Sequence, residues 1–351
     1  MRPVAIVSFA QTPFVRRTRL NDAELVMEVV TAALERARLP RHEIGFCCSG
    51  SSDFLTGAPF SFVGALDAVG AWPPIQESHV EMDGAWALYE AWVRLQHGDL
   101  DTALVYAFGR SSLGDLQDVL VQQLDPYYLA PLGADPIGLA ALQARALLDG
   151  GEFTERDFAE VAAQNRARAQ SNRHAQVRGS RPAGALLDEP YLAAPLRKHD
   201  CPPISDGAAA IVLAAGDRAR ALCERPAWIA GIDHRIEPHA LGARDLTRSP
   251  STERAAREAN AHERPIDVAE LHAPFSPQEL ILRRALALPG STAINPSGGA
   301  LAANPIMVAG LVRLGEAAAR VIDGVAARAL GHATSGPCLQ QNLVCVLEAR
   351  P

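Results

Sequence analysis

Apolar residues recur at intervals of three and four positions in several segments, and this spacing predicts helices with one buried face. From Asp22 to Arg38 the apolar residues fall at positions 25, 26, 29, 30, 33, 34 and 37, and Asp22 is suited to cap the start. The segment Ala85–Leu95 is apolar on more than one face, which indicates a buried helix. Further helices are expected over 137–149, 155–172 and 251–261, with a loop and helix over 298–314.

Short apolar runs bounded by glycine or polar residues predict buried strands. Four are expected in the first part of the chain, at 4–9, 44–48, 103–109 and 208–215. Four more follow, at 227–232, 266–271, 327–331 and 343–347. The first runs of the two sets begin 223 residues apart, but the last runs are only about 130 apart, so the first copy of a duplicated unit carries an insertion of about 90 residues.

The spacing therefore predicts an α/β protein built from two βαβαβ halves with an inserted subdomain. We expect one half over residues 1–124 and 199–224, the other over 225–351, and the insertion over 125–198. The insertion ends in a connection rich in Arg, Gly and Pro at 173–197. Long insertions in compact folds are often functional, so we interpret this one as a lid or specificity subdomain.

Composition excludes several classes of function. The chain has 351 residues, 48% of them hydrophobic, and a net charge of −7, so nucleic-acid binding is not expected. The longest apolar runs, such as Ala208–Ala215, are too short to span a bilayer, so no membrane span is expected. Six cysteines without a CxxC pair and ten histidines without ligand spacing favour a reducing cytoplasm and no metal. Neither a G-x-G-x-x-G loop nor a P-loop is present, so no nucleotide cofactor is expected.

Four segments carry a resemblance to a known family. They are Ala10–Phe14, Cys201–Ala210, Ala269–Phe275 and Asn295–Leu301, and together they resemble, in order, segments of the thiolases. Within that superfamily the chain is similar to the sterol carrier protein X and lipid-transfer-protein branch, and to steroid side-chain aldolase subunits. The resemblance implies a thiolase fold, with duplicated halves in a layered αβαβα arrangement and an inserted loop subdomain.

Three departures from the family determine the expected chemistry. The turn at 80–88, before the predicted buried helix, has no cysteine where a thiolase has its nucleophile. Ala303-Asn304-Pro305 stands in place of Gly-His-Pro. The third departure is the last loop, 331–338, which stands where the Gly-rich loop of the family would often supply an acid/base cysteine. A thiolase needs a thiolate for its acyl-enzyme, so that mechanism is not expected.

Enolate chemistry remains possible without a nucleophile. By the resemblance, His272 and Asn304 match the donors that stabilise a thioester enolate, and an amide donates a hydrogen bond without changing its protonation. A retro-aldol reaction also needs a base for the β-hydroxyl proton. His332, on the last loop, is the first candidate and Asp83 the second. Gly84, Ser335 and Gly336 are expected beside the substrate.

Each candidate has a structural alternative. His272 could be a buried structural histidine, and Asn304 could cap a helix that starts at Pro305. Asp83 could cap the helix 85–95, and His332 could be a solvated turn residue. Cys338 is expected to pack in the interior rather than to react.

Two tyrosines of the insertion stay open. The aldolases that the chain resembles are thought to use tyrosines, so Tyr127 and Tyr128 could contact the substrate. They could equally line an apolar pocket or pack the insertion on the core.

The expected function is carbon–carbon cleavage of a β-hydroxyacyl-CoA with a sterol-type side chain, with coenzyme A present only as part of the substrate. A non-catalytic thiolase-like subunit that binds acyl-CoA, and an acetyl-CoA acetyltransferase, are the alternatives. The resemblance implies a homodimer or a heterodimer with a second thiolase-like chain, and a small OB-fold, zinc-ribbon (DUF35) partner.

Overall fold

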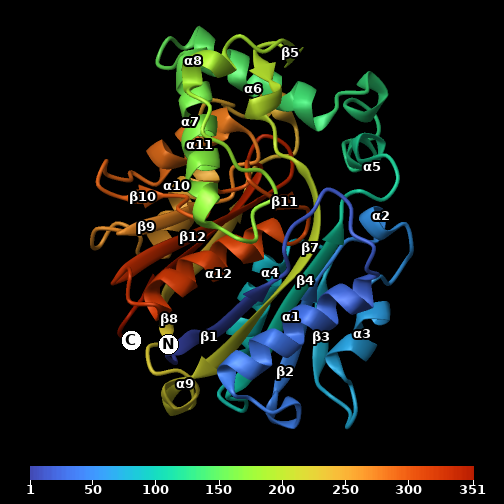
Figure 1. Ribbon diagram of the computed structural model, residues 1–351, viewed down its shortest axis with the longest axis vertical. Coiled ribbons are helices and arrows are strands. Elements are labelled where there is room, and N and C mark those ends of the chain that lie inside the picture. Colours follow the sequence, from blue (N-terminus) through green and yellow to red (C-terminus); the bar gives the residue numbers. More distant parts are fainter.

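The computed structural model describes residues 1–351 and contains one continuous sheet made of two five-stranded parts of the same topology, which meet where Ala5 and Ile6 pair with Trp228 and Ala227 (Figure 1). We call these parts the first and the second sheet. The first has the order β3-β2-β4-β7-β1, and the second has the matching order β10-β9-β12-β13-β8. The first sheet comprises β1 (Val4–Gln11), β2 (Phe46–Gly50), β3 (Glu77–Val80), β4 (Thr102–Arg110) and β7 (Ile204–Ala215). The second comprises β8 (Ala227–Ile236), β9 (Val268–Leu271), β10 (Ala293–Ile294), β12 (Arg328–Ser335) and β13 (Gln341–Glu348).

Two central helices lie between the sheets. α4 (Gly84–Gln96) and α12 (Ala309–Ile322) contribute Leu88, Leu95, Leu311 and Leu314 to one buried cluster that also contains residues of both sheets. Figure 1 shows α12 crossing the middle of the molecule between the two sheets. Helices that are apolar on several faces can be buried on all sides, as the sequence pattern of 85–95 predicts.

Other helices cover the outer faces. α1 (Asp22–Ala37) and α3 (Val63–Val69) pack on the first sheet, and α10 (Pro250–Glu258) and α11 (Ser276–Ala285) pack on the second. The predicted duplicated α/β architecture with αβαβα layers is therefore confirmed. The short helices α2 (Asp53–Thr56) and α9 (Gly216–Leu222) complete the first half.

Several predicted boundaries are wrong by a few residues. Asn21, not Asp22, caps α1, in a capping box with Glu24. The helix predicted within 298–314 begins only at Ala309, because the two-residue strand β11 (Asn304–Pro305) pairs with the start of β7.

The excursion between β4 and β7 covers the second half. It contains α5 (Leu116–Gln122), α6 (Pro136–Asp149), α7 (Glu155–Arg168), α8 (Ala183–Leu186) and the hairpin of β5 (Tyr191–Ala193) and β6 (Leu196–Arg197). α7 packs on α11, so the insertion of the first half rests on the second. The predicted boundaries of the three parts stay a prediction. No helix combines the length and the hydropathy that a bilayer crossing needs.

Candidate active site

A cavity of about 490 Å³ lies where the two halves meet the insertion. Its wall is mostly apolar, with α5 and α6 on one side and the loops after β9 and β12 on the other. A larger cleft of about 780 Å³ lies between α1, α9 and the end of α12, and none of the predicted site residues lines it. The predicted residues His272, Asn304, Asp83, Ser335 and Gly336 all line the smaller cavity.

His272 and Asn304 form a hydrogen-bonded pair in this cavity. His272 directly follows β9, and Asn304 is held in β11, where Ser205 Oγ accepts a bond from its backbone N–H at 3.1 Å. The backbone N–H of Thr334 donates to His272 Nδ1 at 3.4 Å, so the proton of the neutral ring is on Nε2. Nε2 then donates to Asn304 Oδ1 at 3.0 Å.

This arrangement leaves the Asn304 amide nitrogen free. Its Nδ2 makes no hydrogen bond within the chain, and the residue borders the cavity. An amide N–H₂ of this kind can donate to an anionic oxygen. The alternative that Asn304 caps a helix from Pro305 is wrong, since α12 starts four residues later.

His272 is neutral in this environment. Burial is the main cause that lowers its pKa to about 4; the Arg313 charge acts in the same direction, and the bond to Asn304 opposes the shift. The imidazole therefore fixes Asn304 through Nε2–H over the whole physiological pH range.

Asp83 joins the N-termini of both central helices. It caps α4 by accepting from the Ala85 N–H at 2.9 Å, and it accepts from the Gly310 and Leu311 N–H groups of α12 at 2.8 and 2.9 Å. Burial raises its pKa, and these three donors oppose the rise. The carboxylate thus occupies the anion-binding ends of two helices, and the structural alternative of a helix cap is confirmed.

His332 is not on a loop, so that prediction is wrong. β12 continues to Ser335, and His332 is fully buried within it, opposite Val344 of β13. Its Nε2 bonds Asn342 Oδ1 at 3.1 Å, its Nδ1 has no partner, and the ring does not line the cavity. Burial lowers the pKa of His332 to about 3. The alternative of a solvated turn residue is equally wrong.

Three expected substrate contacts also lie elsewhere. Tyr127 and Tyr128 are 81% and 79% exposed on the loop after α5, so they neither line the cavity nor pack on the core. Gly84 is the first residue of α4, and a Cβ there would lie 2.6 Å from the Cβ of Ala107. Its small size serves packing of the central layer and not substrate contact.

Two cysteines line the cavity, but neither is a thiolate. Burial raises the pKa of Cys338 to about 11 and that of Cys201 to about 12. Cys338 packs against Leu124 and Leu139, in agreement with the predicted interior role. Since thiolate is the nucleophilic form, neither residue replaces the missing thiolase cysteine.

The sequence reasoning missed His239. It lies on the exposed loop after β8, lines the cavity, and its ring makes no hydrogen bond within the chain. Apart from His272 it is the only imidazole in the lining. A single histidine in a loop carries no sequence signal that could have singled it out.

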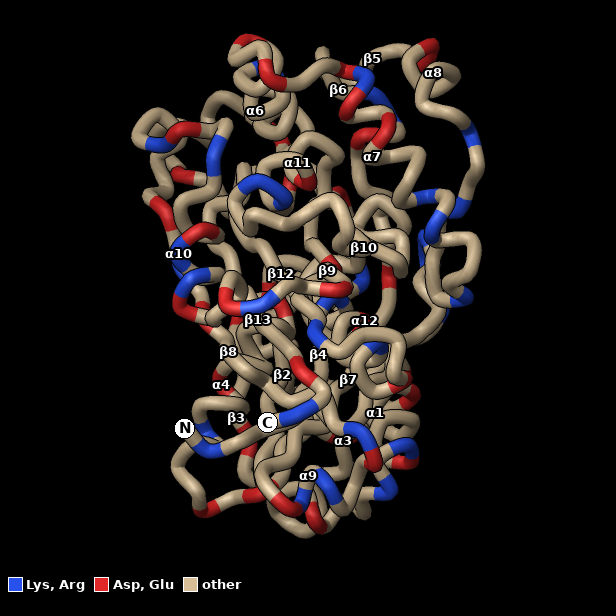
Figure 2. The backbone as a smooth tube through the Cα atoms, turned by 90° about the vertical axis from the view of Figure 1, so that its left-hand side faces the viewer, with Lys and Arg blue, Asp and Glu red and all other residues tan.

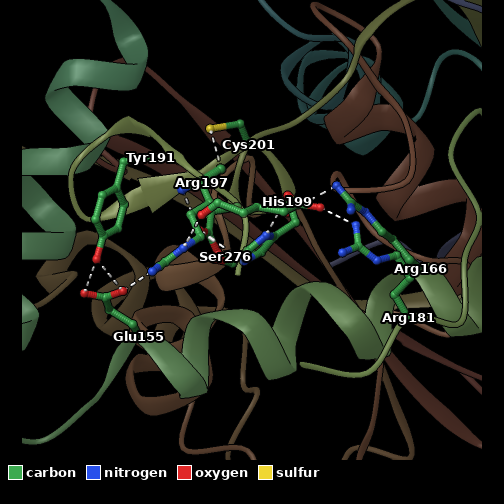
Figure 3. Close-up of polar contacts among 10 residues, drawn as sticks. Glu155, Arg166, Arg181, Tyr191, Arg197, His199, Cys201 and Ser276 are labelled. Carbon is green, nitrogen blue, oxygen red and sulfur yellow. Dashed lines mark hydrogen bonds and ion pairs between the residues drawn. The ribbon is translucent and has the colours of Figure 1, made fainter. Parts of the chain in front are cut away.

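A buried polar cluster behind the cavity was also missed (Figure 3). Ser276, the first residue of α11, donates to Asp200 at 2.5 Å, and Asp200 accepts from the Arg197 backbone N–H at 2.8 Å. His199 Nδ1 lies 3.2 Å from a carboxylate oxygen of Glu189. The cluster ties the end of the insertion to α11, beside the cavity residue Cys201. Ser before Pro277 is a helix-start signal that could have identified α11.

Comparison with known proteins gives relatives along nearly the whole chain, although no protein-family model matches. The acetyl-CoA acetyltransferase of Methanothermobacter thermautotrophicus is 26% identical, covering 92% of this chain and 94% of the relative. The 17-hydroxy-3-oxo-4-pregnene-20-carboxyl-CoA lyase of Mycobacterium tuberculosis is 28% identical over 64% of this chain and 61% of the relative.

Solved structures share the fold. The Ltp2-ChsH2(DUF35) aldolase superposes with a TM-score of 0.80 at 21% identity, covering 99% of this chain and 98% of that one. Human mitochondrial 3-ketoacyl-CoA thiolase superposes with a TM-score of 0.79 at 17% identity, covering 100% of this chain and 99% of that one. The chain therefore has the fold of these thiolase-like structures and is similar in sequence to both an acetyltransferase and a pregnene-carboxyl-CoA lyase.

Proposed function

We propose that the chain is an acyl-CoA carbon–carbon lyase, which splits a β-hydroxyacyl-CoA into a ketone or aldehyde and a shorter acyl-CoA. The observation that carries the proposal is the His272–Asn304 pair, which presents a free amide donor to an apolar cavity without a nucleophile. The pregnene-carboxyl-CoA lyase among the relatives supports a sterol-type acyl group.

The reaction needs one base and one enolate donor. The base removes the proton of the β-hydroxyl, the oxygen–Cβ bond becomes a carbonyl, and the Cα–Cβ bond breaks. Its electron pair passes through Cα to the thioester oxygen, where Asn304 Nδ2 donates to the enolate. Cα then takes the proton back from the base. His272 acts through Asn304 and is a positioning residue.

His239 is our candidate for the base. Its unbonded imidazole borders the cavity, whereas His332 is buried away from it and the oxygens of Asp83 already accept three backbone N–H bonds. The acetyltransferase alternative is disfavoured because an acyl-enzyme needs a nucleophile. The N-cap of α4 is an aspartate, and the cavity cysteines are protonated thiols.

A thiolase-like subunit that binds acyl-CoA beside a catalytic partner is the second candidate. It is favoured by the buried position of His332 and by the bonded state of Asp83, because the chain itself then offers few bases. The Ltp2-ChsH2(DUF35) aldolase, a complex of the same fold, supports a partner for this chain as well, either thiolase-like or of the DUF35 kind, in the cytoplasm.

Cleavage of a β-hydroxy steroid acyl-CoA, followed by mass spectrometry, distinguishes the two functions. The purified chain is compared with the chain co-expressed with a thiolase-like or DUF35 protein from its own source. Ketosteroid and short acyl-CoA that disappear in His239→Gln and Asn304→Ala support the lyase. Product that forms only with the partner, and survives both substitutions, supports the subunit. A lack of product in every combination contradicts the lyase.

A further inference from the structure

The cavity contains no cationic side chain for the phosphates of an acyl-CoA. Its ionisable residues are Asp83, two histidines and two cysteines, and no Lys or Arg lines it. Coenzyme A carries a diphosphate and a 3′-phosphate, which proteins bind with arginine or lysine. An acyl group in the cavity therefore leaves its phosphates outside, on a neighbouring surface.

Two arginine-rich segments lie side by side next to the cavity. The first, after β1, contains Arg16, Arg17 and Arg19, and the second, between α7 and α8, contains Arg173 and Arg178. The segments are joined where the Phe14 N–H donates to the His174 carbonyl at 3.0 Å and where His174 Nδ1 lies 3.2 Å from the Thr12 carbonyl.

Both segments also contact the strand that borders the cavity. Gln176 donates to the carbonyl of the cavity residue Ile204 at 3.1 Å, and Val15 pairs with Asp206 of the same strand. Both segments thus contact β7 at or next to Ile204.

All five arginines are exposed, and none lies within ion-pair distance of a carboxylate. Arg173 bonds the His174 ring at 3.1 Å and Arg178 bonds the Arg173 carbonyl at 2.9 Å, so neither guanidinium is neutralised. The carboxylate of Asp206, whose backbone pairs with Val15, is buried and accepts from Thr18 and Ser112.

This positive surface stands out in a chain of net charge −7, in which more than half of the arginines are paired with acids. Figure 2 shows a run of basic positions along the margin of the molecule beside α7 and above α12. Unpaired arginines raise the local concentration of anions.

We infer that Arg16, Arg17, Arg19, Arg173 and Arg178 form a surface that binds the phosphates of coenzyme A while the acyl end passes Ile204 into the cavity. The inference of this arginine surface rests on the proposed function, because that function makes acyl-CoA the substrate. Binding of coenzyme A can be measured without any cleavage.

Calorimetric titration with coenzyme A tests the surface. The double variant Arg16→Gln/Arg173→Gln is compared with Arg257→Gln/Arg350→Gln, which removes the same charge from exposed, unpaired arginines elsewhere. We expect the Kd for coenzyme A to rise at least tenfold in the first variant and less than twofold in the control. Added salt should lower the affinity of the wild type for coenzyme A, because it screens the charges of the arginines and phosphates. Pantetheine, which lacks the phosphates, should bind all three equally.

Equal affinity of wild type and Arg16→Gln/Arg173→Gln for coenzyme A overturns the inference, as does a wild type that binds no coenzyme A. Circular dichroism checks that the variants fold, and the single variants replace the double variant if it does not. If the double variant loses affinity for coenzyme A while the wild type does not cleave the β-hydroxyacyl-CoA, the result supports the surface and contradicts the lyase. Cleavage with unchanged affinity supports the lyase and overturns the surface.

Discussion

Replacement of Asp83 separates its role as a helix cap from a role in acid–base chemistry. In Asp83→Ala three buried backbone N–H groups, those of Ala85, Gly310 and Leu311, lose their acceptor. An unpaired buried donor costs about 1–3 kcal/mol. Because water from the adjacent cavity can reach part of this site, we take the lower end and expect a loss of about 3–4 kcal/mol in the free energy of unfolding.

Asp83→Asn should cost less. The amide oxygen can keep the bonds from Ala85 and Leu311, but its NH₂ group then faces the Gly310 N–H, where two donors meet. We expect a loss of about 2 kcal/mol, from one charge-assisted bond and the helix-dipole interaction. Asp115→Asn is the matched control, since Asp115 caps the exposed helix α5, and it should cost under about 1 kcal/mol.

Urea unfolding, followed by circular dichroism, measures all three variants. The role of Asp83 as a helix cap is supported if the free energy of unfolding falls most in Asp83→Ala, less in Asp83→Asn and least in Asp115→Asn. A loss below about 1 kcal/mol in Asp83→Ala refutes the reasoning, because it means that the two helices do not depend on the carboxylate. A stable Asp83→Asn that has lost cleavage of the Cα–Cβ bond would instead assign Asp83 to acid–base chemistry.

Three further predictions concern residues whose positions the structure settles. Burial lowers the pKa of His272 to about 4 and of His332 to about 3, while unfolded histidine titrates near 6.5, so unfolding takes up protons below about pH 6.5. Urea unfolding should therefore show a lower free energy of unfolding at pH 5 than at pH 7, by up to about 1.4 kcal/mol per pH unit for each histidine. The difference between the two pH values should be smaller in His332→Asn, and equal stability of the wild type at both pH values contradicts the prediction. Burial raises the pKa of Cys338 to about 11, so iodoacetamide at pH 7.5 should label it at least tenfold more slowly than free cysteine, and mass spectrometry showing rapid labelling contradicts the packing role. Tyr127→Phe and Tyr128→Phe should each leave the kcat of the chain within about twofold, because both side chains are exposed outside the cavity, and a tenfold loss would place a tyrosine at the reacting atoms.

The layered fold could be predicted because its strands are continuous apolar runs. Their repetition predicts the duplication whatever the identity of the surface residues. The ends of the elements could not be predicted in the same way. Gly331-His332-Ala333-Thr334 has the composition of a loop, yet it continues β12, because Asn342 and His272 bond its polar side chains and backbone.

The site was predictable only in part, since its pairs are joined through the tertiary structure. His272 and Asn304 were identified by their positions in family-like segments, and the structure brings them within hydrogen-bond distance. The position of Asn304 depends on the pairing of β11 with Ser205, which no local pattern indicates. His239 and the arginine surface are assembled from separate loops, so their function depends on neighbours that the local sequence does not specify.

Turnover of a β-hydroxy steroid acyl-CoA by Asn304→Ala is the most direct test of the account, which depends on enolate stabilisation by the Asn304 amide. Loss of one oxyanion donor lowers kcat by about 10²–10³-fold. We therefore expect the kcat of Asn304→Ala to fall by that factor, while the variant stays folded and keeps the Kd of the wild type for coenzyme A. An Asn304→Ala protein that cleaves the substrate as fast as the wild type would contradict the proposed mechanism.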